Sequence, residues 1–272
     1  MSFTEECLST YAVRKTAKEK EKFRTFLTES LQKEGISCRI QGNKRWKNVL
    51  AGDFDRPRVL FTAHYDTAAR NLFRIPSVVG GSAFRRFFRL VKESVLSIFV
   101  SRKPSPASAN DNTSGVCCLF RLAKLLQGQS GAAFAFTDGE ECGMKGVRLL
   151  KKQYKALAGI PVVVLDCVGN GDRFGVLYYR RQNKKTADML ASHLEKEEFY
   201  AFSHKAGETF STEAEEFFRG VSIAAFYKKG RVYSFPDIHT AYDTEIRVRN
   251  VEYLAKRLAS FDFSAAENAA KE

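Results

Sequence analysis

The sequence has no long uninterrupted apolar run and no segment with the composition of a linker. No apolar stretch approaches the roughly 18 residues that a membrane-spanning helix needs, so no span is predicted. Residues 1–7 include Glu5 and Glu6 and lack the basic start and apolar run of a signal peptide. No stretch is rich in Pro, Gly and Ser, and no internal repeat is found. We therefore expect a single domain over residues 1–272, located in the cytoplasm.

Cysteine patterns typical of metal sites are also missing. None of the six cysteines has a spacing such as Cys-x-x-Cys. Cys117 and Cys118 fall on a predicted buried helix, whereas Cys142 and Cys167 each follow an acidic residue. Small buried thiols are the simplest interpretation, and free thiols without an export signal fit the cytoplasm.

Positive charge, in contrast, is plentiful. The formal net charge is +13, and such a basic field attracts nucleic acids, anionic membranes and acidic substrates alike. The Lys and Arg residues are spread along the chain, with no RNP-like aromatic stretch and no zinc-finger spacing. We therefore expect no nucleic-acid partner. With 44% hydrophobic and 12% aromatic residues the chain can bury a sizeable core, which excludes a disordered protein.

Predicted strands and helices alternate along most of the chain. Strands are expected at about 36–40, 46–51, 58–63, 132–137, 161–165, 174–179 and 221–227. Helices are expected at about 11–33, 114–126, 144–154 and 185–197 and from about 248. This alternation predicts an α/β fold whose open, mostly parallel sheet is covered on both faces.

A segment at about 68–109 interrupts the alternation. Its apolar residues follow helical spacing at Phe84, Phe87, Phe88, Val91, Val95, Ile98 and Phe99. Arg85, Arg89 and Lys92 lie on another face, and a basic amphipathic helix of this kind can lie on an anionic membrane. We expect the stripe to pack on its own protein or a second subunit, or to form a lid over the site. Membrane-surface contact through residues 84–100 and a homo-oligomer remain open alternatives.

Acids and histidines follow several predicted strands, at the edge of the sheet where ligands of open α/β proteins bind. These residues are His64, Asp66, Asp111, Glu140, Glu141, Asp166 and His239. Each has an ordinary explanation when taken singly. Asp111 could cap the following helix, and Glu140 and Glu141 could suit the positive end of the next helix. Because these residues fall into five groups that follow different segments at the same predicted rim, we favour one common site.

The chemical types in this set fit a metal centre. Two imidazoles and three carboxylates without a thiolate suit a borderline cation such as zinc in an open catalytic site. Two metal ions about 3.5–4 Å apart need a carboxylate that bridges them, and hydrolysis also needs an unligated base. The adjacent Glu140 and Glu141 could divide the roles of base and ligand.

The order His-x-Asp, Asp-Asn-x-Ser-Gly, Glu-Glu, Asp, His resembles that of the co-catalytic zinc aminopeptidases of clan MH, over residues 48–244. The resemblance implies a three-layer α/β/α fold with a central, mostly parallel mixed sheet, shared with glutamate carboxypeptidase and the glutaminyl cyclases. It also implies a hydrolase that releases N-terminal residues from peptides with a free N-terminus. Two Zn²⁺ ions would be the cofactors, with Co²⁺ or Mn²⁺ as substitutes.

The resemblance also implies a role for each site residue. His64, Asp111 and Asp166 would hold one zinc ion. Asp111, as the bridge, would hold the other together with Glu141 and His239.

Two further acids have implied roles outside the ligand set. Glu140 would be the general base, and Asp66 would orient His64. Glu140 and Asp166 would also contact the α-amino group of the substrate.

The chain departs from the family pattern in two places. Relatives often carry a Ser-Asp-His-like stretch where this chain has Ser-Thr-Glu at 211–213, which leaves the specificity pocket open. A tyrosine that stabilises the oxyanion in some relatives is Ile238 here, and Tyr242 or Tyr65 could replace it. His193 and His204 are expected to be surface or structural residues.

Two rival functions stay open at this point. A glutaminyl-cyclase-like acyltransferase would hold one zinc ion on the same fold. A non-catalytic, membrane-associated relative is less favoured, because no expected ligand and no base is lost.

Overall fold

The computed structural model describes residues 1–71, 77–79, 100–104, 108–206, 210–230, 232–235 and 237–265. Ten strands form the central sheet, in the order β1-β2-β7-β3-β8-β11-β12-β5, with β9 beside β11 and β10 beside β9. They are β1 (Cys38–Gly42), β2 (Lys47–Gly52), β3 (Val59–His64), β5 (Ser77–Val79), β7 (Ala132–Thr137), β8 (Val162–Leu165), β9 (Arg173–Tyr178), β10 (Tyr200–Lys205), β11 (Gly220–Lys229) and β12 (Val232–Phe235). Strands β4 (Ala69–Asn71) and β6 (Val100–Pro104) pair separately.

The middle of the sheet is parallel and its borders are antiparallel. Strands β7, β3, β8 and β11 run parallel to one another. Strands β1 and β2 are antiparallel to their neighbours, as are β12 and β5. Strand β9 is antiparallel to β11 and parallel to β10. The parallel centre places the carboxyl ends of β7, β3 and β8 at one edge of the sheet, which is the edge predicted to carry the site.

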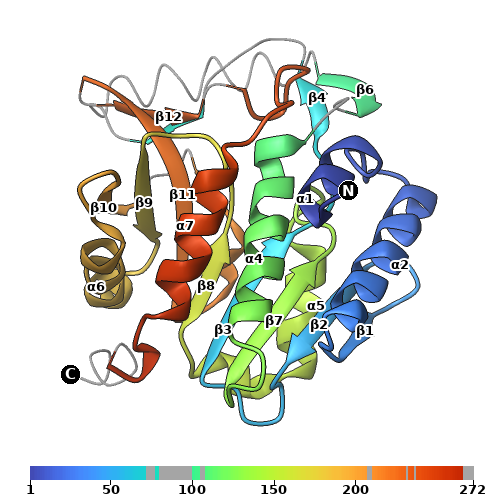
Figure 1. Cartoon of the computed structure of the whole chain (residues 1–272), viewed down its shortest axis with the longest axis horizontal. Coiled ribbons are helices and arrows are strands. Elements are labelled where there is room, and N and C mark those ends of the chain that lie inside the picture. The colour runs from blue at the N-terminus through green and yellow to red at the C-terminus, as the bar shows by residue number, and fades with distance from the viewer. Residues whose placement is uncertain are drawn as a thin grey trace.

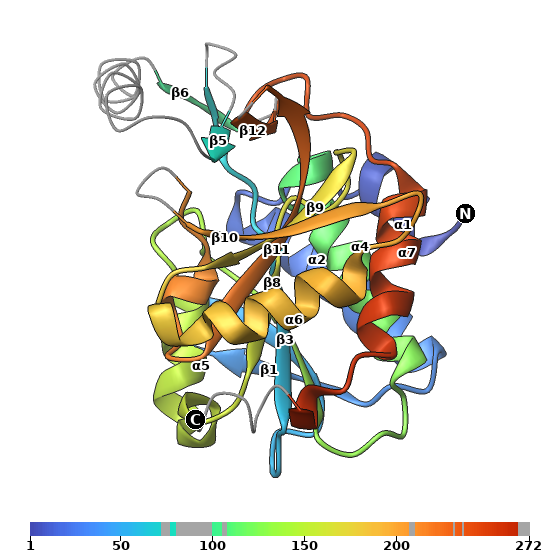
Figure 2. The ribbon, with the colours of Figure 1, turned by 90° about the vertical axis from the view of Figure 1, so that its left-hand side faces the viewer.

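Helices cover both faces of the sheet, as the two views show (Figures 1 and 2). They are α1 (Phe3–Ser9), α2 (Ala17–Lys33), α4 (Ser114–Leu125), α5 (Lys145–Gln153), α6 (Lys184–Leu194) and α7 (Val248–Ala259). Buried side chains of α2, α4, α6 and α7 share one core with one face of the sheet, and α5 packs into a second core on the other face. The predicted three-layer α/β/α fold is therefore confirmed.

Strand β3 shows why the central strands read as continuous apolar runs in the sequence. All six of its residues are buried, because helices cover both faces of the sheet. Phe61 packs in the core shared with α4, whereas Leu60 packs in the core shared with α5. His64, the last residue of β3, is the first polar site residue to follow this run.

Most predicted elements are confirmed, with ends that shift by a few residues. The first long helix begins at Ala17 rather than near residue 11, because Thr16 and Glu19 form a capping box at its start. The N–H of Arg14 instead donates to the hydroxyl of Thr67, and its main-chain oxygen accepts the N–H of Thr67. Residues 11–15 therefore cannot continue the helix. Gly35 follows the helix with a φ of 75°, a conformation that favours glycine.

Within the part of the chain that the structure describes, one α-helix and five strands were not predicted: α1, β4, β5, β6, β10 and β12. The predicted amphipathic stripe at residues 84–99 lies outside the described part of the chain. Among the described residues, no helix is both long and apolar enough to cross a membrane. All six cysteines are free thiols, and four of them are buried, whereas Cys38 is partly buried and Cys142 is exposed.

Candidate metal centre

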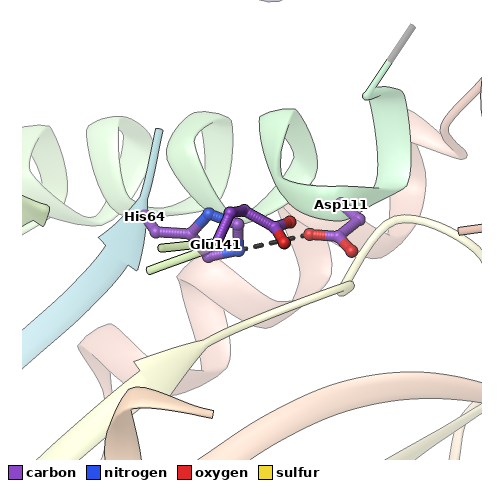
Figure 3. A group of neighbouring side chains, drawn as sticks. All are labelled: His64, Asp111 and Glu141. Carbon is purple, nitrogen blue, oxygen red and sulfur yellow. Dashed lines mark ion pairs between the residues drawn. The ribbon is translucent and has the colours of Figure 1, made fainter. Parts of the chain in front are cut away.

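Five segments bring the predicted site residues together at the carboxyl edge of the parallel strands. His64 ends β3, Asp166 directly follows β8, and Glu141 lies in the loop after β7. Asp111 lies in the irregular turn Ala109–Thr113, which leads into α4. His239 lies in the loop after β12. Figure 3 shows His64, Glu141 and Asp111 converging from three of these segments.

Asp111 lies between the two histidines. Its Oδ1 is 3.2 Å from Nε2 of His64, and its Oδ2 is 2.8 Å from Nε2 of His239. Each histidine also faces a second carboxylate. Nε2 of His64 is 3.7 Å from Oδ1 of Asp166, and Nε2 of His239 is 3.5 Å from Oε1 of Glu141. The arrangement is thus two His–carboxylate clusters that share one carboxylate.

The imidazoles compensate the charge of the buried carboxylates. Burial by itself lowers the pKa of His64 and His239, but their contacts with the surrounding carboxylates outweigh burial and raise both pKa values well above the usual range. Burial alone would raise the pKa of Asp111, but the two histidines outweigh it and lower that pKa well below its usual range. Asp111 is therefore ionised and needs a positive partner on each side.

The loop after β7 is held by Asp66. Its carboxylate accepts hydrogen bonds from the backbone N–H groups of Gly139 (2.8 Å), Glu140 (3.0 Å) and Glu141 (3.2 Å). Nδ1 of His64 lies 3.2 Å from the main-chain oxygen of Asp66 and 3.7 Å from its carboxylate. Asp66 therefore contacts His64 mainly through its backbone, and its side chain holds the loop that carries Glu140 and Glu141.

Glu140 and Glu141 differ in their electrostatic surroundings. Burial raises the pKa of Glu140 well above its usual range, and the nearby carboxylates of Glu141 and Asp166 act in the same direction, against His64. Glu140 makes no ion pair with a histidine among the described residues, in contrast to Glu141. The two adjacent acids thus lie in different surroundings.

The donor atoms fit metal ions. Ligand atoms of His64, Asp111 and Glu141 lie within 4.8 Å of one another, as do those of Asp111, Asp166 and Cys167. Oε1 of Glu141 is buried and has no hydrogen-bond donor among the described residues. It lies 3.5 Å from Nε2 of His239, longer than a usual hydrogen bond, so this oxygen keeps the capacity to bind a cation. Neutral imidazole nitrogens and carboxylate oxygens without an obligatory thiolate are the ligands that suit zinc.

The sequence did not point to three buried groups around the site. Arg14 is fully buried and donates hydrogen bonds to the main-chain oxygen of Tyr65 and to the hydroxyl of Thr113. Glu213 is 1% exposed, and burial raises its pKa to about 7. The thiol of Cys167 donates a hydrogen bond to Oδ1 of Asp166 at 3.3 Å. For Glu213 alone the sequence contained a signal, because the chain departs from the family pattern at residues 211–213.

The tyrosines considered for oxyanion stabilisation lie in different surroundings. The hydroxyl of Tyr65 donates to the main-chain oxygen of Lys47 and accepts from Arg24. Both of its hydrogen bonds are therefore made to residues outside the site. Tyr242 is 65% exposed and lies three residues after His239. His193, expected to be structural, lies with its Nε2 2.7 Å from the main-chain oxygen of Arg257.

The fold and these side chains together define a class: an α/β/α protein with a shared-carboxylate site of histidines and acids. The sequence pattern of peptidase family M28 matches residues 48–250, most of the chain. The chain belongs to peptidase family M28, which confirms the family predicted from the order of the site residues. No match was found among curated proteins.

Solved structures share the fold. The LapA aminopeptidase of Legionella pneumophila superposes with a TM-score of 0.64 at 15% identity, covering 98% of this chain and 70% of that chain. A glutaminyl cyclase of Bacteroides thetaiotaomicron gives 0.69 at 15% identity, covering 94% of each chain. A leucine aminopeptidase precursor of the same species gives 0.68 at 16% identity, covering 94% and 93%. At these identities the similarity shows the fold alone.

Proposed function

We propose that this chain is a zinc-dependent aminopeptidase with two metal ions, acting on peptides with a free N-terminus. The observation that carries the proposal is the position of Asp111. One of its oxygens faces His64 and the other faces His239, and each histidine has a further carboxylate beside it. A single-ion site has no need for two such clusters joined by one carboxylate.

His64, Asp111 and Asp166 would hold one zinc ion in this proposal. Asp111, Glu141 and His239 would hold the other. When bound, the ions would polarise the scissile carbonyl group and lower the pKa of the attacking water.

The chain's own groups would position the substrate and move the proton. Glu140 takes the proton from the attacking water and passes it to the leaving amine, because burial raises its pKa and makes the carboxylate a stronger base than an exposed one. Glu140 and Asp166 are also the acids that would receive the positively charged α-amino group. Asp66 supports both steps, since it fixes the backbone of the loop that carries Glu140.

The test is metal content together with product analysis. Protein loaded with zinc and freed of excess metal is expected to hold two zinc ions by mass spectrometry and to release p-nitroaniline from aminoacyl-p-nitroanilides. Addition of a chelator is expected to stop the release. The same sample should be given a peptide that begins with Gln. One zinc ion with pyroglutamate formation and no amino-acid release would replace the proposal by a glutaminyl cyclase.

A further inference from the structure

The segment that carries Asp111 is held through its own backbone by Asp243. Oδ1 of Asp243 accepts the N–H of Asn110 at 2.6 Å, and Oδ2 accepts the N–H of Asp111 at 3.0 Å. The main-chain oxygen of Asp243 accepts the N–H of Ala109 at 3.0 Å. One residue therefore binds three consecutive amides, and its side chain is buried at 2% exposure.

Asp243 belongs to the same loop as His239, four residues further along the chain. Thr240 joins the two parts of this loop, since its N–H donates to the main-chain oxygen of Asp237 and its own main-chain oxygen accepts the N–H of Asp243. The hydrogen bonds of Asp243 thus connect the loop of His239 directly to the segment of Asp111.

The opposite side of the Asp111 segment is bound to the loop after β8. Oδ1 of Asn110 accepts the N–H groups of Gly169 at 2.8 Å and Asn170 at 2.9 Å. Nδ2 of Asn112 donates to the main-chain oxygen of Leu165 at 2.8 Å. The Asp111 segment is therefore fixed from two sides, by neutral amides next to Asp166 and by a carboxylate next to His239.

We propose that Asp243 is a positioning residue that fixes the Asp111 segment against the His239 loop, so that the two oxygens of Asp111 face the two histidines. A ligand site needs its side chains placed to within about 0.5 Å. The backbone of Asp111 cannot shift without breaking a buried hydrogen bond to Asp243, and a buried N–H that is left without an acceptor is unfavourable. The proposal rests on the proposed zinc site for its effect on metal binding, whereas the hydrogen bonds are independent of it.

The first test compares Asp243→Asn with Glu245→Gln. Both variants replace an acid of the same loop by its amide, but Glu245 has an exposed side chain. Asparagine keeps one acceptor oxygen, so one of the two N–H groups loses its acceptor. Zinc affinity, measured by competition with a chelator, is expected to fall 10–100-fold in the Asn variant, as is common when an outer partner of a metal ligand is lost. The Gln variant is expected to stay within twofold of the unchanged protein.

A spectroscopic measurement separates positioning from a general loss of stability. The visible spectrum of the protein saturated with Co²⁺ reports the geometry of its ligands. It is expected to change in Asp243→Asn and to stay unchanged in Glu245→Gln. An Asn variant with unchanged zinc affinity and an unchanged Co²⁺ spectrum would overturn the proposal.

Amide exchange keeps this test independent of the proposed function. In metal-free protein, exchange of the Asn110 and Asp111 amides is expected to be at least about tenfold faster in Asp243→Asn, while the amides of α4 keep their protection. If the unchanged protein binds no zinc, the proposed function fails, and this exchange result alone decides whether Asp243 holds the segment. Equal exchange in the two variants would contradict the proposal.

A second variant covers the case in which Asp243→Asn does not fold. Asp243→Glu keeps the charge and both acceptor oxygens but moves them by one methylene. A folded Glu variant with weakened zinc binding would support the proposal, and one that binds zinc like the unchanged protein would overturn it. If neither variant folds, Asp243 is required for the fold itself, and the positioning role is refuted.

Discussion

At the scale of single residues, Glu140 and Glu141 show how two adjacent identical side chains can differ in role. Glu141 lies 3.5 Å from Nε2 of His239 and is thus part of the ion-pair cluster. Glu140 makes no such contact among the described residues, and its pKa is raised more strongly than that of Glu141. Environment, rather than residue type, therefore separates the proposed base from the proposed ligand.

The first prediction concerns Glu140→Gln. The amide cannot accept a proton, so the hydrolysis rate is expected to fall by about 10²-fold or more, while both zinc ions stay bound. Steady-state kinetics and metal analysis on the same sample measure the two effects. Glu198→Gln changes an exposed acid and serves as the control. Full activity in the Glu140 variant would refute its role as the base.

The second prediction concerns Glu213, whose folded-state pKa of about 7 lies above the ordinary value of 4.5 because the side chain is buried. The folded protein therefore binds a proton that the unfolded chain has already released between these pH values. Stability from this group is present below about pH 4.5 and is lost as the pH rises through about 7. The full loss is about 3 kcal/mol.

Glu213→Gln removes this titration without changing the shape of the side chain. In urea unfolding of metal-free protein, the stability of the variant relative to the unchanged protein is expected to increase from pH 5 to pH 8. A stability difference that is constant over this range would show that Glu213 does not titrate with a raised pKa.

At the scale of elements, α2 and the segment before it reach the site through two buried cations. Lys20 lies 2.7 Å from Asp138, which directly precedes the loop that carries Glu140. Arg14 donates to the main-chain oxygen of Tyr65, between His64 and Asp66, and to the hydroxyl of Thr113. The N-terminal part of the chain therefore supports the segments of the candidate site through a buried ion pair and buried hydrogen bonds.

The third prediction follows from these contacts of Arg14. Arg14→Met would leave the buried oxygens of Tyr65 and Thr113 and the partly buried oxygen of Tyr11 without their donor, so the free energy of unfolding is expected to fall by about 3 kcal/mol or more. Urea unfolding measures the loss. Lys18→Met, at an exposed position of α2, is the control and is expected to change stability by less than about 0.5 kcal/mol. A loss in Arg14→Met no larger than in the control would show that these hydrogen bonds do not contribute.

The element scale also shows what the sequence could reveal. Central strands such as β3 are buried on both faces, so they appear as apolar runs, and the polar residues that end them mark the rim. Edge strand β10 has no fully buried residue, and β12 has only four residues, so neither shows a pattern that predicts a strand. Arg14 and Asp243 were missed because their partners are backbone atoms far away in the sequence, which only the folded chain brings close.

At the scale of the whole molecule, the ligand segments extend from His64 to His239 and include the ends of β3 and β8. Metal ions bound to all five segments would connect the ends of β3 and β8 with the loops after β7 and β12 and with the turn before α4. An ion that binds the folded chain but not the unfolded chain stabilises the fold by mass action. Free zinc at about 100 times its dissociation constant would add about 2.7 kcal/mol for one site.

The fourth prediction is that zinc raises the melting temperature by about 5–10 °C, since each kcal/mol shifts it by about 2–4 °C in a protein of this size. A chelator is expected to reverse the shift. Asp111→Ala removes the carboxylate that both histidines face and is expected to abolish most of the shift, although its metal-free melting temperature is lower from the start. Equal melting temperatures with and without zinc in the unchanged protein would mean that these five segments do not form one metal centre. A shift that survives in the Asp111 variant would place the zinc ions elsewhere.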